Sequence, residues 1–129
     1  MNTSNMAADP KAVATQFLKL AAAGNARQGA AQLVTRDFRH HNVHFPGDGE
    51  SLFAAMDQNA AQFPGKQLEV VQALQEGDRV ATLCMVRHTP EEAGFVVSHW
   101  FRFEDGKIAE LWDLAQEIPK ETPNQYGAV

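Results

Sequence analysis

The sequence contains a single cysteine, Cys84, and no long apolar run. One cysteine excludes an internal disulfide framework and any zinc site built from several cysteines. The uninterrupted apolar stretches are a few residues long, far below the ~20 residues that a membrane-spanning helix needs. The first residues include no basic segment followed by an apolar one, so we expect no secretion signal. These absences predict a cytoplasmic protein without a membrane partner.

Positive charge is scarce as well. The chain has 11 lysine and arginine residues against 16 aspartate and glutamate residues, a formal net charge of −5, and its basic residues form no cluster. An acidic chain is repelled by the phosphates of nucleic acids, so we expect no nucleic-acid partner. A length of 129 residues suits one domain with one core. We therefore expect a single domain over residues 1–129, with flexible tails at 1–9 and 120–129.

Residue types divide unevenly along the chain. Residues 1–61 contain 14 of the 20 alanines, whereas residues 62–129 contain 12 of the 18 valine, isoleucine and threonine residues. Alanine favours helices and β-branched residues favour sheets, so helices should come first and strands second, which is typical of the α+β class. We expect helices at residues 10–23, 26–34 and about 51–63, a short strand entering a loop at 36–45, and strands at 67–75, 79–89, 95–104 and 107–117.

The strand expected at residues 95–104 carries the most informative pattern. Alternation places His99 on one face with Phe95, Val97, Phe101 and Phe103. A histidine among large apolar side chains is partly desolvated, which lowers its pKa and leaves it neutral and able to accept a proton. The same pattern also fits a core histidine whose polar atoms are satisfied by the backbone.

The following strand places Asp113 among small and apolar neighbours, where a carboxylate needs a partner or a task. A two-residue turn at Asp105-Gly106 would put His99 opposite Trp112 and Asp113 on the other face of the sheet. A three-residue turn with a glycine bulge would put Asp113 diagonal to His99 on one face. We favour the second register, which predicts a His/Asp couple that serves either acid–base chemistry or a structural link.

Three histidines lie close together at His40, His41 and His44. Such a cluster suggests a metal site, but it lies on a loop-like stretch and has no glutamate at helical spacing. Adjacent histidines on a strand also point to opposite faces. We therefore expect no metal, and instead expect His41 and Asn42 to line a pocket.

Two segments resemble a known family. Phe38-Arg-His-His-Asn42, and the stretch from Ser98 to Pro119 that contains Phe-Arg-Phe-Glu-Asp-Gly-Lys-Ile and Glu-Leu-Trp-Asp-Leu-Ala-Gln, are similar to the SnoaL-like polyketide cyclases. That group belongs to the nuclear-transport-factor-2-like superfamily. The resemblance covers about residues 12–119. It implies a cone: a curved mixed sheet wrapped over three N-terminal helices and enclosing one pocket.

The resemblance also implies roles for particular residues. Asp113 corresponds to the acid/base of the cyclases, His99 to its supporting residue and His41 to a histidine near the pocket mouth. Gln116 corresponds to a glutamine of the same motif, although alternation would point it outward. Many bacterial relatives have a histidine where this chain has Leu111, which implies a less polar pocket. We expect His99 and Asp113 to line the largest cavity, with Phe101 and Leu111 beside them as residues that contact the substrate.

Together these features predict a cofactor-independent acid–base enzyme that acts on an apolar small molecule by cyclisation, isomerisation or related carbonyl chemistry. The alternative is a non-catalytic ligand-binding or assembly domain of the same fold. We also expect a homodimer formed through the outer face of the sheet, where Trp100 and Trp112 offer apolar contact.

Overall fold

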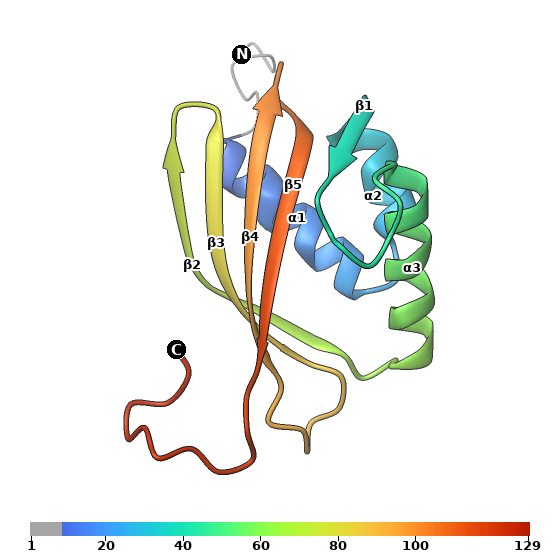
Figure 1. Ribbon diagram of the computed structural model, residues 1–129. Helices are drawn as coiled ribbons and strands as arrows, with labels where there is room; N and C mark the ends of the chain where they lie inside the picture. The colour runs from blue at the N-terminus through green and yellow to red at the C-terminus, as the bar shows by residue number, and fades with distance from the viewer. Residues whose placement is uncertain (1–8) are drawn as a thin grey trace, which may run out of the picture.

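The computed structural model describes residues 9–129. Within this range three helices precede most of a five-stranded sheet, which confirms the expected α+β class (Figure 1). The elements are α1 (Pro10–Ala22), α2 (Ala26–Leu33), β1 (Val34–His40), α3 (Gly49–Gln62), β2 (Gln67–Glu76), β3 (Arg79–Arg87), β4 (Phe95–Glu104) and β5 (Lys107–Glu117). Residues 1–8, which form most of the expected N-terminal tail, lie outside the described residues. Residues 120–129 contain no helix or strand.

The sheet is mixed, with the strand order β1-β5-β4-β3-β2. Strand β1 runs parallel to β5, and the other neighbours are antiparallel. The long strands curve around one side of the helical layer, and α1 crosses their concave face (Figure 1). This is the expected cone of a curved mixed sheet over three helices. None of the helices in the described range is long and apolar enough to cross a membrane.

The helix ends show which local signals the chain uses. At α1, Asp9 accepts a hydrogen bond from the Lys11 backbone at 3.3 Å, and Pro10 occupies the first helical position, where proline is favoured. At α2, the side chain of the N-cap residue Asn25 makes no hydrogen bond. Asp57 of α3 replaces it and accepts from the backbone N–H of Ala26 at 2.7 Å. The cap of α2 is therefore a tertiary contact.

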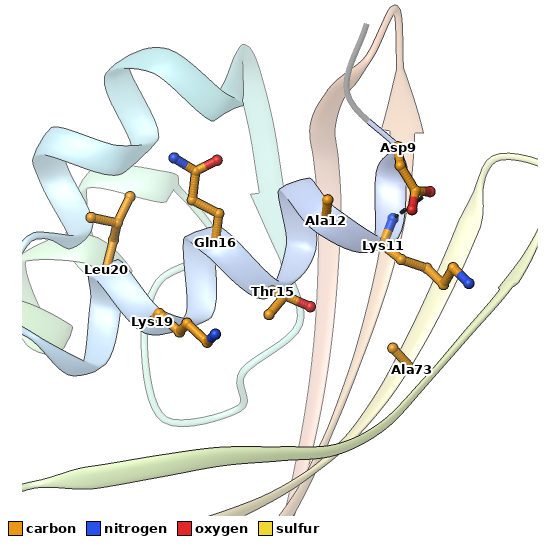
Figure 2. A pocket seen from close by; sticks show the side chains of 8 residues that line it. All are labelled: Asp9, Lys11, Ala12, Thr15, Gln16, Lys19, Leu20 and Ala73. Carbon is orange, nitrogen blue, oxygen red and sulfur yellow. Dashed lines mark hydrogen bonds between the residues drawn. The ribbon is translucent and has the colours of Figure 1, made fainter. Parts of the chain in front are cut away.

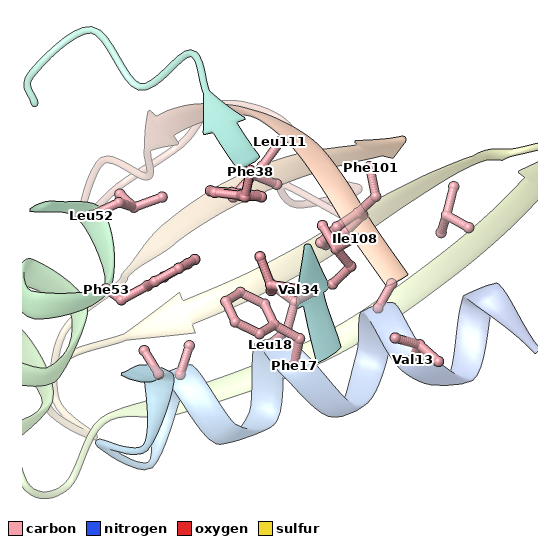
Figure 3. Close-up of a cluster of buried hydrophobic side chains, with 14 of the residues drawn as sticks. Val13, Phe17, Leu18, Val34, Phe38, Leu52, Phe53, Phe101, Ile108 and Leu111 are labelled. Atoms are coloured by element: carbon pink, nitrogen blue, oxygen red, sulfur yellow. The ribbon is translucent and has the colours of Figure 1, made fainter. Parts of the chain in front are cut away.

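The core lies between the helices and the concave face of the sheet (Figure 3). Phe17 of α1 meets Phe53 of α3 edge to face, with ring centroids 5.7 Å apart. From the sheet side, Phe101 and Leu111 are almost completely buried. Aromatic and branched side chains from both layers thus fix how the helices sit on the sheet, and this sets the walls of any cavity between them.

The register of the β4–β5 hairpin differs from the one that we favour on sequence grounds. Asp105 and Gly106 have φ values of 50° and 81°, and they form a two-residue turn in which Glu104 opposes Lys107. The register then shifts after the pair Phe103–Ile108, because β5 carries one extra residue, Ala109, before Glu110 pairs with Arg102. The favoured three-residue turn is therefore wrong.

This bulge decides which side chains of β5 face the core. It places Ile108 on the concave side together with Leu111, whereas simple alternation puts them on opposite faces. Beyond the bulge, His99 pairs directly with Asp113, and Val97 pairs with Ala115. Neither register considered from the sequence contains this direct pairing. The shared face of His99 and Asp113, which the favoured register predicts, is present, but it arises from the bulge in β5 and not from a three-residue turn.

Candidate active site

A cavity of about 330 Å³ lies between the concave face of the sheet, α1, α3 and the loop that follows β1. This volume is at the lower end of the range typical for small-molecule sites. Its polar lining residues are Asn42, Asn59, Lys66, His88, His99 and Asp113. The rest of the lining is apolar and comes from Leu18, Ala21, Ala22, Phe45, Leu52, Ala55, Met56, Leu68, Val86, Phe95, Val97 and Ala115. An apolar ligand with a few polar groups would suit such a lining.

Asp113 reaches the cavity from β5 and is held by the loop after β1. Asn42 donates a hydrogen bond from Nδ2 to Oδ2 of Asp113 at 3.0 Å. The orientation of the Asn42 amide is fixed in turn, because its Oδ1 accepts from the backbone N–H of His44 at 3.0 Å. The loop itself is anchored to β5, since the His41 backbone N–H donates to the Leu111 carbonyl at 2.9 Å. Asp113 thus has a defined orientation in a largely apolar cavity.

His99 faces the same cavity from β4 and is 7% exposed. Burial lowers the pKa of His99 to about 4; the charge of Asp113 opposes this shift and that of Lys66 adds to it. The imidazole is therefore neutral at neutral pH. Its Nδ1 is fully buried and has no hydrogen-bond partner within the described residues, so Nε2 is the ring nitrogen that a ligand could reach.

Two residues expected to contact a substrate belong to the core instead. Phe101 is 0% exposed and Leu111 is 1% exposed, and neither lines the cavity. Phe101 and Leu111 oppose each other across β4 and β5, and the pair lies two residues along the strands from the pair of His99 and Asp113. They lie beside the site, as expected, but the helices pack against them and leave no room for a ligand.

His41 and Gln116 also lie away from the cavity. The His41 ring stacks on Trp112 with centroids 4.9 Å apart, and its Nε2 lies 2.6 Å from Oε2 of Glu110. Gln116 is exposed and pairs with Val96, whose face is opposite that of Val97 and Ala115. The expectation that His41 lines the pocket is therefore wrong for this structure, and Gln116 points outward as alternation predicts.

The histidine cluster separates as expected for adjacent strand residues. His40 is buried, and its Nε2 lies 2.7 Å from the Pro46 carbonyl, whereas His41 faces Glu110. His44 is exposed. Across residues 9–129, no group of three histidine, cysteine, aspartate or glutamate side chains is placed to hold a metal ion.

A larger hollow, of about 700 Å³, lies between α1 and β2 (Figure 2). The expectation that His99 and Asp113 line the largest cavity is therefore wrong. This hollow is lined by Lys11, Thr15, Gln16 and Lys19 along α1 and by Ala73 of β2. Its one carboxylate, Asp9, accepts a hydrogen bond from the α1 backbone, so no acid–base pair is present there. The smaller cavity is the better candidate.

Three further polar residues line the cavity, Asn59, Lys66 and His88, and no sequence pattern indicates them. Lys66 donates from Nζ to Oδ1 of Asn59 at 2.7 Å. His88 packs between Phe63 and Phe95, with ring centroids 4.6 and 5.5 Å away. These residues come from the turn before β2, from α3 and from the end of β3. Only the folding of the sheet over α3 brings them together, so no local motif could have revealed them.

The fold and the cavity place the chain among α+β cones with an internal site, and a comparison with protein families makes the assignment specific. The model of the SnoaL-like domain matches residues 14–111, which is more than half of the chain. The chain therefore belongs to the SnoaL-like family, as its motifs indicate. A comparison with curated proteins gave no match.

Solved structures share the fold at low sequence identity. IdmH from Streptomyces antibioticus, provisionally assigned as a polyketide cyclase, is 22% identical with a TM-score of 0.68, and the match covers 84% of this chain and 92% of that one. AclR from Streptomyces galilaeus, provisionally assigned as a hydroxylase, is 23% identical with a TM-score of 0.70, covering 83% and 88%. A provisional ketosteroid isomerase from Kribbella flavida is 19% identical with a TM-score of 0.67, covering 90% and 84%.

Proposed function

We propose that this protein is a cofactor-independent acid–base enzyme that removes a proton from a carbon atom next to a carbonyl group of an apolar small molecule. One observation carries the proposal: the carboxylate of Asp113, oriented by Asn42, stands directly opposite the neutral His99 in a mostly apolar cavity. The provisional assignments of structural relatives as a cyclase and as an isomerase support the same class of reaction.

Each residue has a definite part in this reaction. The carboxylate of Asp113 takes the proton, the C–H bond breaks, and its electron pair moves into an enolate. His99, protonated on Nε2, donates a hydrogen bond to the enolate oxygen, where negative charge develops. The enolate then either recovers the proton at another carbon, which is an isomerisation, or attacks a second carbonyl carbon, which closes a ring. Asn42 acts as a positioning residue for Asp113.

Proton exchange tests this proposal without knowledge of the natural substrate. The purified protein is incubated in D₂O with a panel of aryl ketones and 1,3-dicarbonyl compounds, and NMR follows the loss of the proton next to the carbonyl. We expect exchange above the buffer rate for compounds that bind. Asp113→Asn should reduce this rate about 10²- to 10⁴-fold, as for loss of a general base.

Asp105→Asn provides the matched control. It removes the same charge from an exposed turn position with φ of 50°, which asparagine readily adopts. This variant should exchange protons at the wild-type rate. Equal exchange rates in Asp113→Asn and the wild type would refute the assignment of Asp113 as the base.

The second candidate is a non-catalytic domain that holds an apolar metabolite. The predominance of apolar side chains in the cavity lining favours it. In that case the panel compounds would bind, the protein would catalyse no exchange, and Asp113→Asn would change affinity alone.

A further inference from the structure

The cavity contains a second polar group, opposite in charge to Asp113. Lys66 is half-buried at the turn between α3 and β2, and its side chain lines the cavity. Every ion pair within residues 9–129 involves an arginine or a histidine as the cation. The ammonium group of Lys66 therefore has no carboxylate within 4.0 Å in this range. A desolvated cation without a counterion is costly in a folded protein unless a ligand supplies the counterion.

Asn59 completes the arrangement. Its Oδ1 accepts the hydrogen bond from Lys66 at 2.7 Å, which leaves its Nδ2 as a donor with no partner among the described residues. Lys66 and Asn59 both line the cavity. An ammonium group and an amide N–H side by side are suited to the two oxygen atoms of a carboxylate, since hydrogen bonds to charged acceptors are the strong ones.

The acidic side chain that contacts His88, another lining residue of the cavity, is already engaged. Glu92 accepts a hydrogen bond from the backbone N–H of His88, and its Oε2 lies 3.2 Å from Nδ1 of the same residue. Burial lowers the pKa of Lys66, which is the direction expected for an ammonium group without a carboxylate partner. Asp113 is the only acidic residue among those that line the cavity.

We propose that Lys66 and Asn59 form a binding site for a substrate carboxylate, so that the substrate is an apolar keto acid. The proposal rests on the proposed function in naming the ligand a substrate. Lys66 precedes β2, and Asp113 lies on β5, three strands away in the sheet order. The carboxylate therefore binds at one end of the cavity, several bonds away from the carbon that gives its proton to Asp113, and repulsion by Asp113 opposes the reverse orientation.

Equilibrium binding of a matched pair of probes tests this site. The probes are 4-oxo-4-phenylbutanoate and its primary amide, which differ in charge but hardly in shape. Calorimetry with the wild type should show that the acid binds at least about tenfold more tightly than the amide, as for a hydrogen bond to a charged group. Lys66→Met keeps most of the side-chain length and should remove this preference while changing the amide affinity less than about twofold.

Two further variants make the test specific. Lys107→Met removes the same charge from an exposed strand end and should keep the preference, and Lys66→Arg should keep most of it. Failure of the wild type to bind the acid, equal affinity for the two probes, or an unchanged preference in Lys66→Met would each overturn the proposal. These measurements need no turnover, so loss of the Lys66 site would leave the proton-exchange test of Asp113 unaffected.

Discussion

Asn42 and Asp113 are joined by a hydrogen bond of 3.0 Å although 71 positions separate them in the sequence. The bond connects the loop after β1 to the middle of β5 and gives the proposed base its orientation. The same asparagine is held by the His44 backbone, so the carboxylate depends on the conformation of a short loop.

Asn42→Ala should lower the rate of proton exchange about tenfold or more, because a misdirected base loses its alignment with the C–H bond. The decrease should fall on kcat more than on KM, since Asn42 acts through Asp113. His44→Ala removes an exposed side chain of the same loop and keeps the backbone N–H that holds Asn42, so it should exchange at the wild-type rate. An unchanged kcat in Asn42→Ala would show that the amide does not position the base.

The stability of the protein should decrease on acidification because of His99. Its pKa is about 4 in the folded protein and about 6.5 when unfolded. Between these values the unfolded state binds more protons than the folded state. The free energy of unfolding therefore decreases as the pH is lowered from 6.5 to 4, by up to about 3 kcal/mol. His99→Gln should flatten this part of the profile in chemical denaturation at pH 4 to 7.

The exposed His44 gives the control for that profile. His44→Gln should follow the wild-type pH dependence, because this side chain lies in solvent. A His99→Gln profile that is as steep as the wild type between pH 4 and 6.5 would contradict the neutral, desolvated state of His99.

Glu110 should be a major contributor to stability on the other face of β5. Burial raises its pKa, but hydrogen bonds from His41, Arg39 and Arg102 outweigh this and bring the pKa to about 2. Glu110→Gln leaves the two guanidinium groups without their shared carboxylate, and Arg102 is largely buried. We expect a loss of roughly 3 kcal/mol in the free energy of unfolding, measured by urea denaturation at pH 7.

Glu104 is the matched comparison for Glu110. It also contacts Arg102, at 2.9 Å, but half of its side chain is exposed. Exposed ion pairs contribute little, so Glu104→Gln should cost less than about 1 kcal/mol. Equal losses in the two variants would show that burial of Glu110 is not the cause.

The outer face of the sheet should form the interface of a homodimer. Leu74, Ala81, Trp100 and Trp112 oppose one another across four strands, and Leu74 and Trp100 are 63% and 50% exposed. Contact with the same face of a second copy of the chain would remove this apolar row from water, which favours association. Light scattering should give about twice the chain mass of 14.2 kDa.

Trp100→Glu places a charge in the middle of this row and should produce a monomer with an unchanged circular dichroism spectrum. Val43→Glu is the control, because it adds the same charge at a loop position that is 90% exposed and lies outside the sheet. A monomeric wild type, or a dimeric Trp100→Glu variant, would refute this interface. We expect Trp112 to contribute less to the interface than Trp100, since His41 covers one face of its ring.

The sequence by itself determined the features that depend on neighbouring residues. Alanine-rich segments became helices, and the alternation at Phe95 to Phe103 placed His99 on the concave face. Asp105-Gly106 formed the turn of the last hairpin, because both residues tolerate positive φ. The segments from Phe38 to Asn42 and from Ser98 onward indicated the SnoaL-like family, whose domain model matches residues 14–111. Each of these signals is carried by backbone preferences within a few residues.

Only the tertiary structure decided the contacts that make the site. The bulge at Ala109 pairs His99 with Asp113. No sequence pattern near Ala109 predicts this bulge. Asn42 is hydrogen-bonded to Asp113, which is far away in the chain. Lys66 is hydrogen-bonded to Asn59, which lies on a different element. The His41 side chain contacts Glu110, because a buried carboxylate requires hydrogen-bond donors. Packing of the sheet over the helices chose these partners, and a single sequence does not encode such distant pairings in any readable pattern.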